Sequence, residues 1–245
     1  MLGGALGYTK QSSDLAGDQG SLKMDGWSIS GYATWYNAKD WYVDAMLSWA
    51  NNDYRHRRRV VYVLPGETVD QFAKADSDGS DLSGSLTVGR DFHHEEWNFG
   101  LYGRLQAGRQ DFDAFDEELD SSLPGSGLAL HINDRSVDNL SSILGGKASW
   151  VHSTDWGVLM PSLGLEWQKE YQGDPDTFRA FLISDPTGTP ILITGEALDD
   201  NYFRFNIGLS AVWTKGRSGF IQYDRIFLRD GNEQETLSLG GRIEF

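Results

Sequence analysis

The stretches WSISGYATW (27–35) and WYVDAMLSW (41–49) decide the expected fold. In each stretch apolar and polar side chains alternate, and the apolar set begins and ends with tryptophan, at Trp27 and Trp35 and at Trp41 and Trp49. Successive side chains of a β-strand point to opposite faces, so this pattern predicts strands with one apolar face. Eight residues that rise about 3.3 Å each, tilted by about 40°, cover roughly 20 Å along a membrane normal. That height is close to the apolar band of a transmembrane β-barrel, with aromatic residues at both edges.

The same alternation continues through 97–108, 159–167 and 203–213. It predicts an aromatic girdle formed by Trp27, Trp35, Trp41, Trp49, Trp97, Trp167 and Trp213. Charged residues recur on the opposite face, which would line the lumen: Asp44, Arg104, Lys147, Glu166 and Arg204. These lumen charges could offset one another across a water-filled interior or line the path of an unfolded polypeptide, and their spacing leaves both roles open.

Ten strands are expected, at 2–10, 24–37, 40–55, 80–93, 96–112, 138–153, 156–172, 202–214, 217–229 and 235–245. Short connectors at 38–39, 94–95, 154–155 and 215–216 alternate with long or polar ones at 11–23, 56–79, 113–137 and 173–201, and with a shorter one at 230–234. Segment 177–196 is predicted to hold a small hairpin of its own, with DPTG as its turn. Short turns on one side and long loops on the other are typical of outer-membrane barrels. We therefore expect an all-β, antiparallel, up-and-down transmembrane barrel.

Composition excludes several other classes. The net charge of −15 argues against nucleic-acid binding, which needs a basic surface to displace counterions from phosphates. The absence of cysteine excludes disulfides, cysteine-ligated zinc and cysteine nucleophiles. The mean hydropathy of −0.45 would suit a soluble sandwich or lipocalin-like barrel, but it also suits a membrane barrel, which exposes only alternate residues to lipid. The paired tryptophans, strand lengths and one-sided loops favour the membrane barrel.

The sequence resembles the C-terminal translocator domain of the autotransporters, the type V secretion proteins of Gram-negative bacteria. The matching stretches are LGGALGYTKQSS (2–13), DGWSISGYATWY (25–36), WYVDAMLSWANNDYRHRR (41–58), LTVGRDF (86–92), MPSLGLEWQKEY (160–171), FRFNIGLSAVW (203–213) and LSLGGRIEF (237–245). Each motif is degenerate alone, whereas their order and spacing over essentially the whole chain, taken as one domain of residues 1–245, make the match specific.

The resemblance implies a non-enzymatic outer-membrane translocator that anchors and exports a covalently linked N-terminal passenger. Its implied partners are outer-membrane lipid and lipopolysaccharide, the barrel-assembly machinery and periplasmic chaperones; no cofactor is implied. The family barrel has twelve strands and a plug helix, and the match here begins at what corresponds to the third strand. We therefore expect a first hairpin, the plug helix, the passenger and a signal peptide upstream, with this chain as a fragment; closure of the ten strands by themselves is the alternative.

The stretch LSLGGRIEF at 237–245 resembles the C-terminal signal that barrel-assembly machinery reads. Leu237, Leu239, Ile243 and Phe245 alternate with polar or small residues and would face lipid. The terminal phenylalanine is the residue that the resemblance singles out for targeting.

The cluster DYRHRRR (53–59) is the one basic cluster in an acidic chain. Arg57, Arg58 and Arg59 could pair with lipopolysaccharide phosphates, because guanidinium groups bind phosphate bidentately, or they could simply form a charged strand end.

Two groups of residues contain side chains of types found in enzyme sites. HHEE at 93–96 contains metal-ligating residue types but falls in a predicted short turn without further ligands, so no metal site is expected. Asp111, Asp113 and His131 could be placed in the water-activating scheme of omptin-type rim proteases, but no companion Asp–His pair accompanies them. A stand-alone pore or adhesin is the other alternative to a translocator.

Overall fold

The computed structural model describes residues 1–172, 177–195, 199–214, 216–228 and 234–243. Ten long strands of this part form one antiparallel sheet, in the order in which they follow along the chain. They are β1 (Leu2–Leu15), β2 (Gly20–Tyr36), β3 (Trp41–Leu64), β4 (Glu67–His94), β5 (Trp97–Phe112), β8 (Arg135–Trp150), β10 (Gly157–Glu170), β13 (Asn201–Trp213), β14 (Arg217–Phe227) and β15 (Glu235–Ile243). A short strand, β9 (His152–Thr154), also pairs with β10. The predicted all-β, up-and-down architecture is confirmed.

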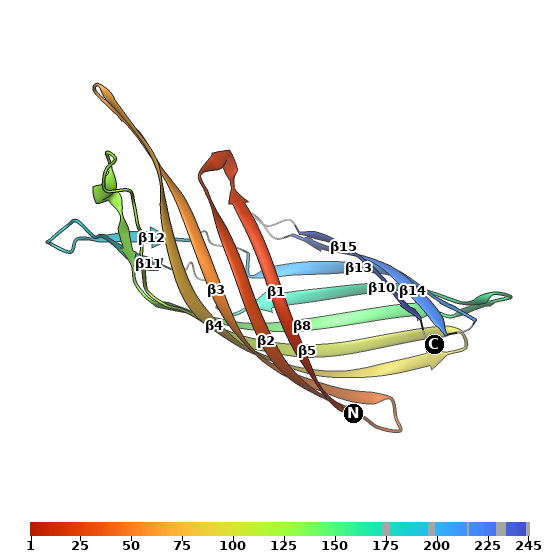
Figure 1. The fold of residues 1–245 in the computed structure, drawn as a ribbon. Helices are drawn as coiled ribbons and strands as arrows, with labels where there is room; N and C mark the ends of the chain where they lie inside the picture. The colour runs from red at the N-terminus through yellow and green to blue at the C-terminus, as the bar shows by residue number, and fades with distance from the viewer. Residues whose placement is uncertain (173–176, 196–198, 215, 229–233, 244–245) are drawn as a thin grey trace.

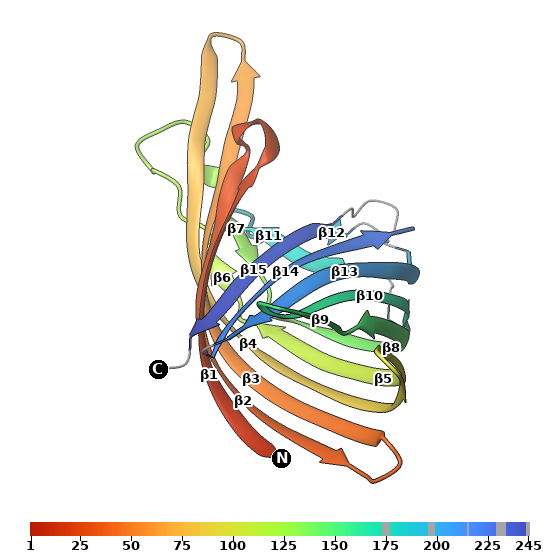
Figure 2. The ribbon, with the colours of Figure 1, turned by 90° about the vertical axis from the view of Figure 1, so that its right-hand side faces the viewer.

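The sheet is strongly curled, and β3 and β4 project beyond its other strands (Figure 1). Figure 2 shows the curl nearly end-on, with β1 and β15 as the two edge strands. Across the residues described, the helical elements are the three-residue 3-10 turns at Ala16–Asp18 and Ser126–Leu128, and neither could cross a bilayer.

The outer parts of the first two hairpins are strands, not the loops that the sequence predicted. β1 and β2 stay paired from Leu2↔Ala33 to Leu15↔Gly20, so 11–23 is mostly strand. β3 and β4 stay paired from Trp41↔Arg90 to Leu64↔Glu67, which converts the predicted connector 56–79 into a continuous hairpin. Backbone hydrogen bonds continue there with polar and apolar side chains mixed on both faces, so no apolar alternation reveals the strand.

The two later long connectors form a small sheet of their own beside this projecting hairpin. It has the order β12-β11-β7-β6, from β12 (Pro190–Thr194), β11 (Thr177–Leu182), β7 (Leu130–Ile132) and β6 (Phe115–Asp116). β11 and β12 pair from Thr177↔Thr194 to Phe181↔Pro190, as the predicted hairpin at 177–196 requires.

A compact cluster fixes this small sheet to the hairpin. Val60, Val69 and Ala73 form a buried cluster, and Leu119 and Leu128 of the connector pack against it. The Arg58 guanidinium donates to both carboxylate oxygens of Glu117 at 2.7 and 2.5 Å. We call this assembly of the β3–β4 extension and the four-stranded sheet the outer unit.

The opposite end of the main sheet carries the short turns. β2 and β3 are joined across 37–40, β4 and β5 across 95–96, and β9 and β10 across 155–156. Asp40 and Glu95 adopt positive φ values of 60° and 54°, which lets the chain reverse within so few residues. Short turns lie on the periplasmic side of outer-membrane barrels, so in a barrel of that kind the outer unit would project to the outside.

Candidate functional site on the inner face of the sheet

The two faces of the main sheet differ in chemistry and in crowding. Leu47 and Leu101, on the apolar face, are each 61 % exposed, whereas Tyr42 and Ile143, on the other face, are 6 % and 2 % exposed. Polar side chains of the second face also reach across an intervening strand, as from β5 to β10. Only the inside of a curled sheet brings side chains of next-nearest strands together. The polar face is therefore the inner one, and the exposed apolar face is the outer one.

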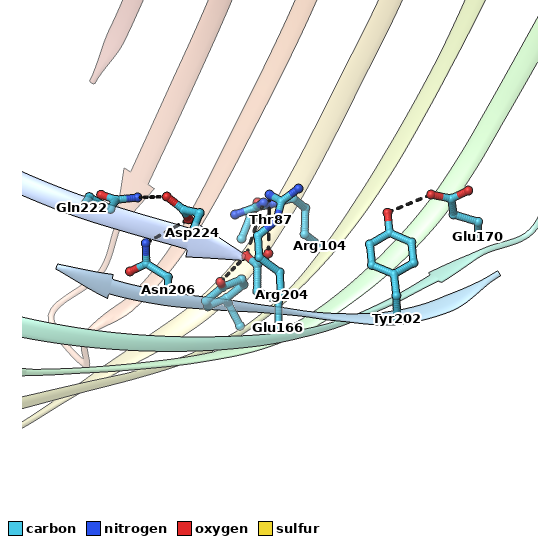
Figure 3. A network of polar contacts seen from close by, with 10 residues as sticks. Thr87, Arg104, Glu166, Glu170, Tyr202, Arg204, Asn206, Gln222 and Asp224 are labelled. Carbon is cyan, nitrogen blue, oxygen red and sulfur yellow. Dashed lines mark hydrogen bonds and ion pairs between the residues drawn. The ribbon is translucent and has the colours of Figure 1, made fainter. Parts of the chain in front are cut away.

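A carboxylate between two guanidinium groups forms the centre of the inner face. Glu166 of β10 lies 3.8 Å from Arg104 of β5 and 4.0 Å from Arg204 of β13. The Tyr102 hydroxyl donates to Glu166 at 2.5 Å, and Arg104 donates to the Thr87 hydroxyl at 3.1 Å. Figure 3 shows these contacts among Thr87, Arg104, Glu166 and Arg204. Three of the five predicted lumen charges therefore meet in one cluster.

Antiparallel register aligns this cluster with a row of tyrosine and glycine. Across β3, β4, β5 and β8 the row reads Tyr42↔Gly89↔Tyr102↔Gly145, and the next partner of Gly145 is Glu166. A side chain at Gly89 would overlap the Tyr42 ring, and one at Gly145 would overlap the Tyr102 ring. Each ring thus lies flat over the glycine of the following strand, which aims the Tyr102 hydroxyl at Glu166.

Sequence reasoning missed this row of tyrosines and glycines. The signal was a glycine on the polar face of one strand at the register position of a tyrosine on the next. Reading it needs the strand register, which no single strand encodes.

Lys147 belongs to a second group on the same face, nearer the short turns. Its ammonium lies 3.3 Å from Asp91 and 5.5 Å from the centre of the Tyr42 ring. The Tyr36 hydroxyl also donates to Asp91. Asp44 shares a row with Thr87 and Arg104, but its side chain makes no hydrogen bond or ion pair with the residues that the structure describes.

Further polar pairs continue along the inner face toward the edge strands. Asn206 and Gln222 both donate to Asp224, at 2.9 and 3.0 Å. The Tyr202 hydroxyl donates to Glu170 at 2.8 Å (Figure 3). Asp224 therefore points inward, which settles the faces of β14, whose alternation is irregular in sequence.

This arrangement suits a solvated surface that contacts many different side chains in turn. Cations and anions alternate at short range and are partly exposed, so no region of one sign would hold a charged polymer tightly. Across the described part of the chain, no group of three or more His, Asp or Glu side chains could hold a metal ion.

Most of the predicted girdle tryptophans lie on the outer face, in two zones. Trp27 and Trp49 meet edge-to-face with ring centres 5.1 Å apart toward the outer unit, and Trp35 and Trp41 lie exposed toward the short turns. Trp97 and Trp213 lie at the short-turn end, and Trp167, at the other end of β10, is only partly exposed. Trp150 and Trp156, which the alternation did not single out, pack against Trp97 and Trp213 with ring centres 6.3 and 6.1 Å apart.

The basic triplet is divided between the two faces. Arg58 points inward to Glu117, whose hydrogen bond raises the pKa of the Arg58 guanidinium. Arg57 and Arg59 point outward and flank the Phe72 ring, with guanidinium carbons 3.6 and 5.8 Å from its centre. Arg59 also donates to both oxygens of Asp70 at 2.8 and 2.6 Å. Arg57 forms no ion pair with any described residue.

Near the triplet, His56 lies inside the outer unit. Its ring stacks on Phe115 at 4.4 Å and contacts the Ser77 hydroxyl at 2.9 Å. Burial there lowers the pKa of the His56 imidazole.

The C-terminal strand exposes alternate apolar side chains on the outer face. Leu237, Leu239 and Ile243 are exposed there. Phe245 lies outside the described residues. The arrangement of the first three is the one that a lipid-facing strand requires.

The residues considered for catalysis lie in separate groups. Asp111 bonds to Arg109 and Ser136, whereas the His131 imidazole lies 2.5 Å from Asp116. The backbone amide of Asp113, just past the end of β5, donates to the Asp78 carbonyl at 2.9 Å. His93 and His94 end β4 beside the turn at 95–96. No shared acid–histidine site connects these groups in the described residues.

Comparisons with known proteins agree with this geometry. The family model for the autotransporter beta-domain matches residues 1–224. The β-domain of the Bordetella autotransporter BrkA aligns with all of this chain and 83 % of its own at 19 % identity, with a TM-score of 0.64. The translocator domain of NalP from Neisseria meningitidis aligns with all of this chain and 74 % of its own at 18 % identity, with a TM-score of 0.66. No curated protein sequence matches the chain.

The two structural likenesses establish the fold, and the family model covers most of the sequence. The chain therefore belongs to the autotransporter β-domain family and is a β-barrel translocator of the bacterial outer membrane that anchors and exports an N-terminal passenger.

Proposed function

We propose that the inner face centred on Glu166 lines the conduit through which the passenger leaves the periplasm. The observation that carries the proposal is the three-sided contact of Glu166 with Tyr102, Arg104 and Arg204 on the polar side of the sheet. An extended polypeptide presents many different side chains in turn. Both arginine contacts with Glu166 are long, at 3.8 and 4.0 Å, so a passing side chain can compete for a guanidinium and be released again.

Crosslinking during export tests this proposal. The chain has no cysteine, so Arg204→Cys and Phe205→Cys each introduce one thiol, on opposite faces of β13. A passenger that carries one cysteine and is stalled by a folded tag should form a disulfide with the thiol at 204 and not with the thiol at 205. Equal crosslinking at both positions, or crosslinking only at 205, would contradict a conduit on the inner face.

Residues 1–245 act as one translocator unit without catalytic activity in this proposal. The sheet runs from β1 to β15 without a break in strand order, which supports a single unit.

The separate partners of Asp111 and His131 give no support to a rim protease. A peptide-cleavage assay tests this part: saturable hydrolysis that is lost in Asp113→Ala would overturn it. Family membership favours export over a stand-alone pore or adhesin.

The C-terminal strand would serve as the assembly signal. Leu237, Leu239, Ile243 and Phe245 would be read by the barrel-assembly machinery after periplasmic chaperones deliver the chain. Deletion of Phe245 should reduce insertion into the outer membrane, measured by heat-modifiability of the membrane fraction. The strand would keep its alternation, so the loss would report on the signal and not on the strand itself. Replacement of the exposed Leu228 by alanine, which leaves the C-terminal strand intact, is the control. Normal insertion of the deleted chain would remove the targeting role.

The tryptophans at the two ends of the outer face would form girdles at the membrane surfaces, because indole rings favour the interface between hydrocarbon and water. Just outside the external girdle, Arg57 and Arg59 would contact lipopolysaccharide phosphates. Arg58 would not take part, because Glu117 holds it on the inner side.

Lipopolysaccharide retention in detergent tests that assignment. Arg57→Gln should lower the amount that co-purifies, and Arg58→Gln, which removes the same charge from the same strand, should not. The reverse order would refute the assignment of these roles.

A further inference from the structure

One cation of the outer face, Arg90, lies at the short-turn edge of the apolar band, and no acidic side chain among the described residues pairs with it. Arg90 of β4 pairs in register with Trp41 on one side and Leu101 on the other, both of which are exposed on the outer face. Its neighbour Asp91 points to the inner face, where it binds Lys147. Arg90 makes no ion pair among the residues described, and its Nε is buried without a hydrogen-bond partner.

Two aromatic rings hold this guanidinium in place. The guanidinium carbon lies 5.7 Å from the centre of the Trp41 ring and 4.9 Å from that of Phe92. Phe92 lies two residues closer than Arg90 to the short turn at 95–96, so Arg90 sits at the level of the periplasmic girdle. An arginine facing lipid costs up to about 2–4 kcal/mol at the bilayer centre and little at the interface, where it can reach a counter-ion.

An apolar hollow begins beside Arg90 and extends toward the middle of the membrane. It has a volume of about 660 Å³, and its lining includes Trp41, Val88, Leu101, Gly103 and Leu144 together with Arg90. Gly103 lies beside Leu144 in register and leaves its position without a side chain, which deepens the hollow. A cation at the membrane surface with an apolar hollow beneath it matches a molecule with an anionic head and an acyl chain.

We propose that Arg90 and this hollow bind one phospholipid of the periplasmic leaflet. The lipid phosphate would accept hydrogen bonds from the guanidinium, which binds phosphate bidentately, and would neutralise its charge. One acyl chain would lie in the hollow between Leu101 and Leu144. The site is specific for a phosphate carried by an acyl lipid, since free phosphate would leave the hollow empty.

The test uses the full-length precursor extracted from outer membranes and native mass spectrometry with added phosphatidylglycerol. Arg90→Gln should weaken binding at least roughly tenfold, because it removes the charge and the two hydrogen bonds of the bidentate contact. Gly103→Leu, which fills the hollow and keeps the charge, should also weaken it. Arg90→Lys should retain part of the binding. Lys39→Gln, at the tip of the β2–β3 turn, removes the same charge elsewhere and should bind like the unmodified protein.

Heat-modifiability of each variant verifies that it is folded, and Arg90→Lys and Gly103→Leu test the site separately if Arg90→Gln does not fold. Diacylglycerol, which lacks the phosphate, should bind poorly, and inorganic phosphate should not displace the lipid. Equal binding by Arg90→Gln and Lys39→Gln would overturn the proposal. Equal binding of diacylglycerol, or displacement by inorganic phosphate, would overturn the assignment to a phospholipid.

Discussion

Replacement of Gly145 by alanine should destabilise the sheet through Tyr102. A Cβ at this position would overlap the far end of the Tyr102 ring, so the ring must move. Its movement breaks the 2.5 Å hydrogen bond from the hydroxyl to Glu166. A hydrogen bond to a charged group contributes about 1.5–3 kcal/mol, so we expect a loss near 2 kcal/mol, about 30-fold in the folding equilibrium.

The assay is urea-dependent unfolding in lipid vesicles, followed by heat-modifiability and tryptophan fluorescence. Gly146→Ala is the matched control, because its Cβ would meet Leu101 at an ordinary 3.4 Å on the outer face. In a Tyr102→Ala background the cost of Gly145→Ala should fall close to zero, since no ring remains to displace. If Gly145→Ala unfolds at the same urea concentration as Gly146→Ala, or if its cost survives in the Tyr102→Ala background, the ring-over-glycine packing is refuted.

Two further predictions concern the outer unit. Arg58→Gln should destabilise the packing of connector 113–137 by about 1–3 kcal/mol, because it leaves the buried Glu117 carboxylate without its cation. Proteolysis within 113–137 should then be faster than in the control Arg57→Gln, and equal rates would contradict the prediction. In the β11–β12 turn, hydrogen bonds from Thr187 and Thr189 lower the pKa of Asp185 to about 2. The ionised carboxylate should therefore stabilise the turn fully above the unfolded pKa of about 4. This contribution should be lost as the pH falls through 2. Hydrogen exchange of the Thr187 and Thr189 amides between pH 4 and pH 2 measures it, and protection that does not change with pH would count against the turn geometry.

The membrane-spanning part of the fold could be predicted because lipid imposes a period of two on its sequence. Trp27 to Trp35 and Trp41 to Trp49 carry apolar side chains at alternate positions, and both segments lie within strands. Outside the membrane that constraint ends. The 56–79 segment mixes polar and apolar side chains on both faces and was predicted as a loop, although its backbone pairs without a break.

The candidate site was predictable residue by residue but not as a cluster. The alternation placed Arg104, Glu166 and Arg204 on one face, yet their meeting depends on the register of four strands and on the curl of the sheet. For the same reason the triplet 57–59 looked like one basic patch. In a strand the middle residue points away from its neighbours, and Arg58 accordingly belongs to the inner side.

The central claim is that the Glu166 face lines water and the opposite face meets lipid. Single cysteines at 204, 206 and 222, on the inner face, and at 205, 207 and 221, on the outer face, test it directly in the folded protein in vesicles. A membrane-impermeant maleimide should label the first set and leave the second set unlabelled. Labelling without this alternation, or labelling of the second set in preference to the first, would contradict the account.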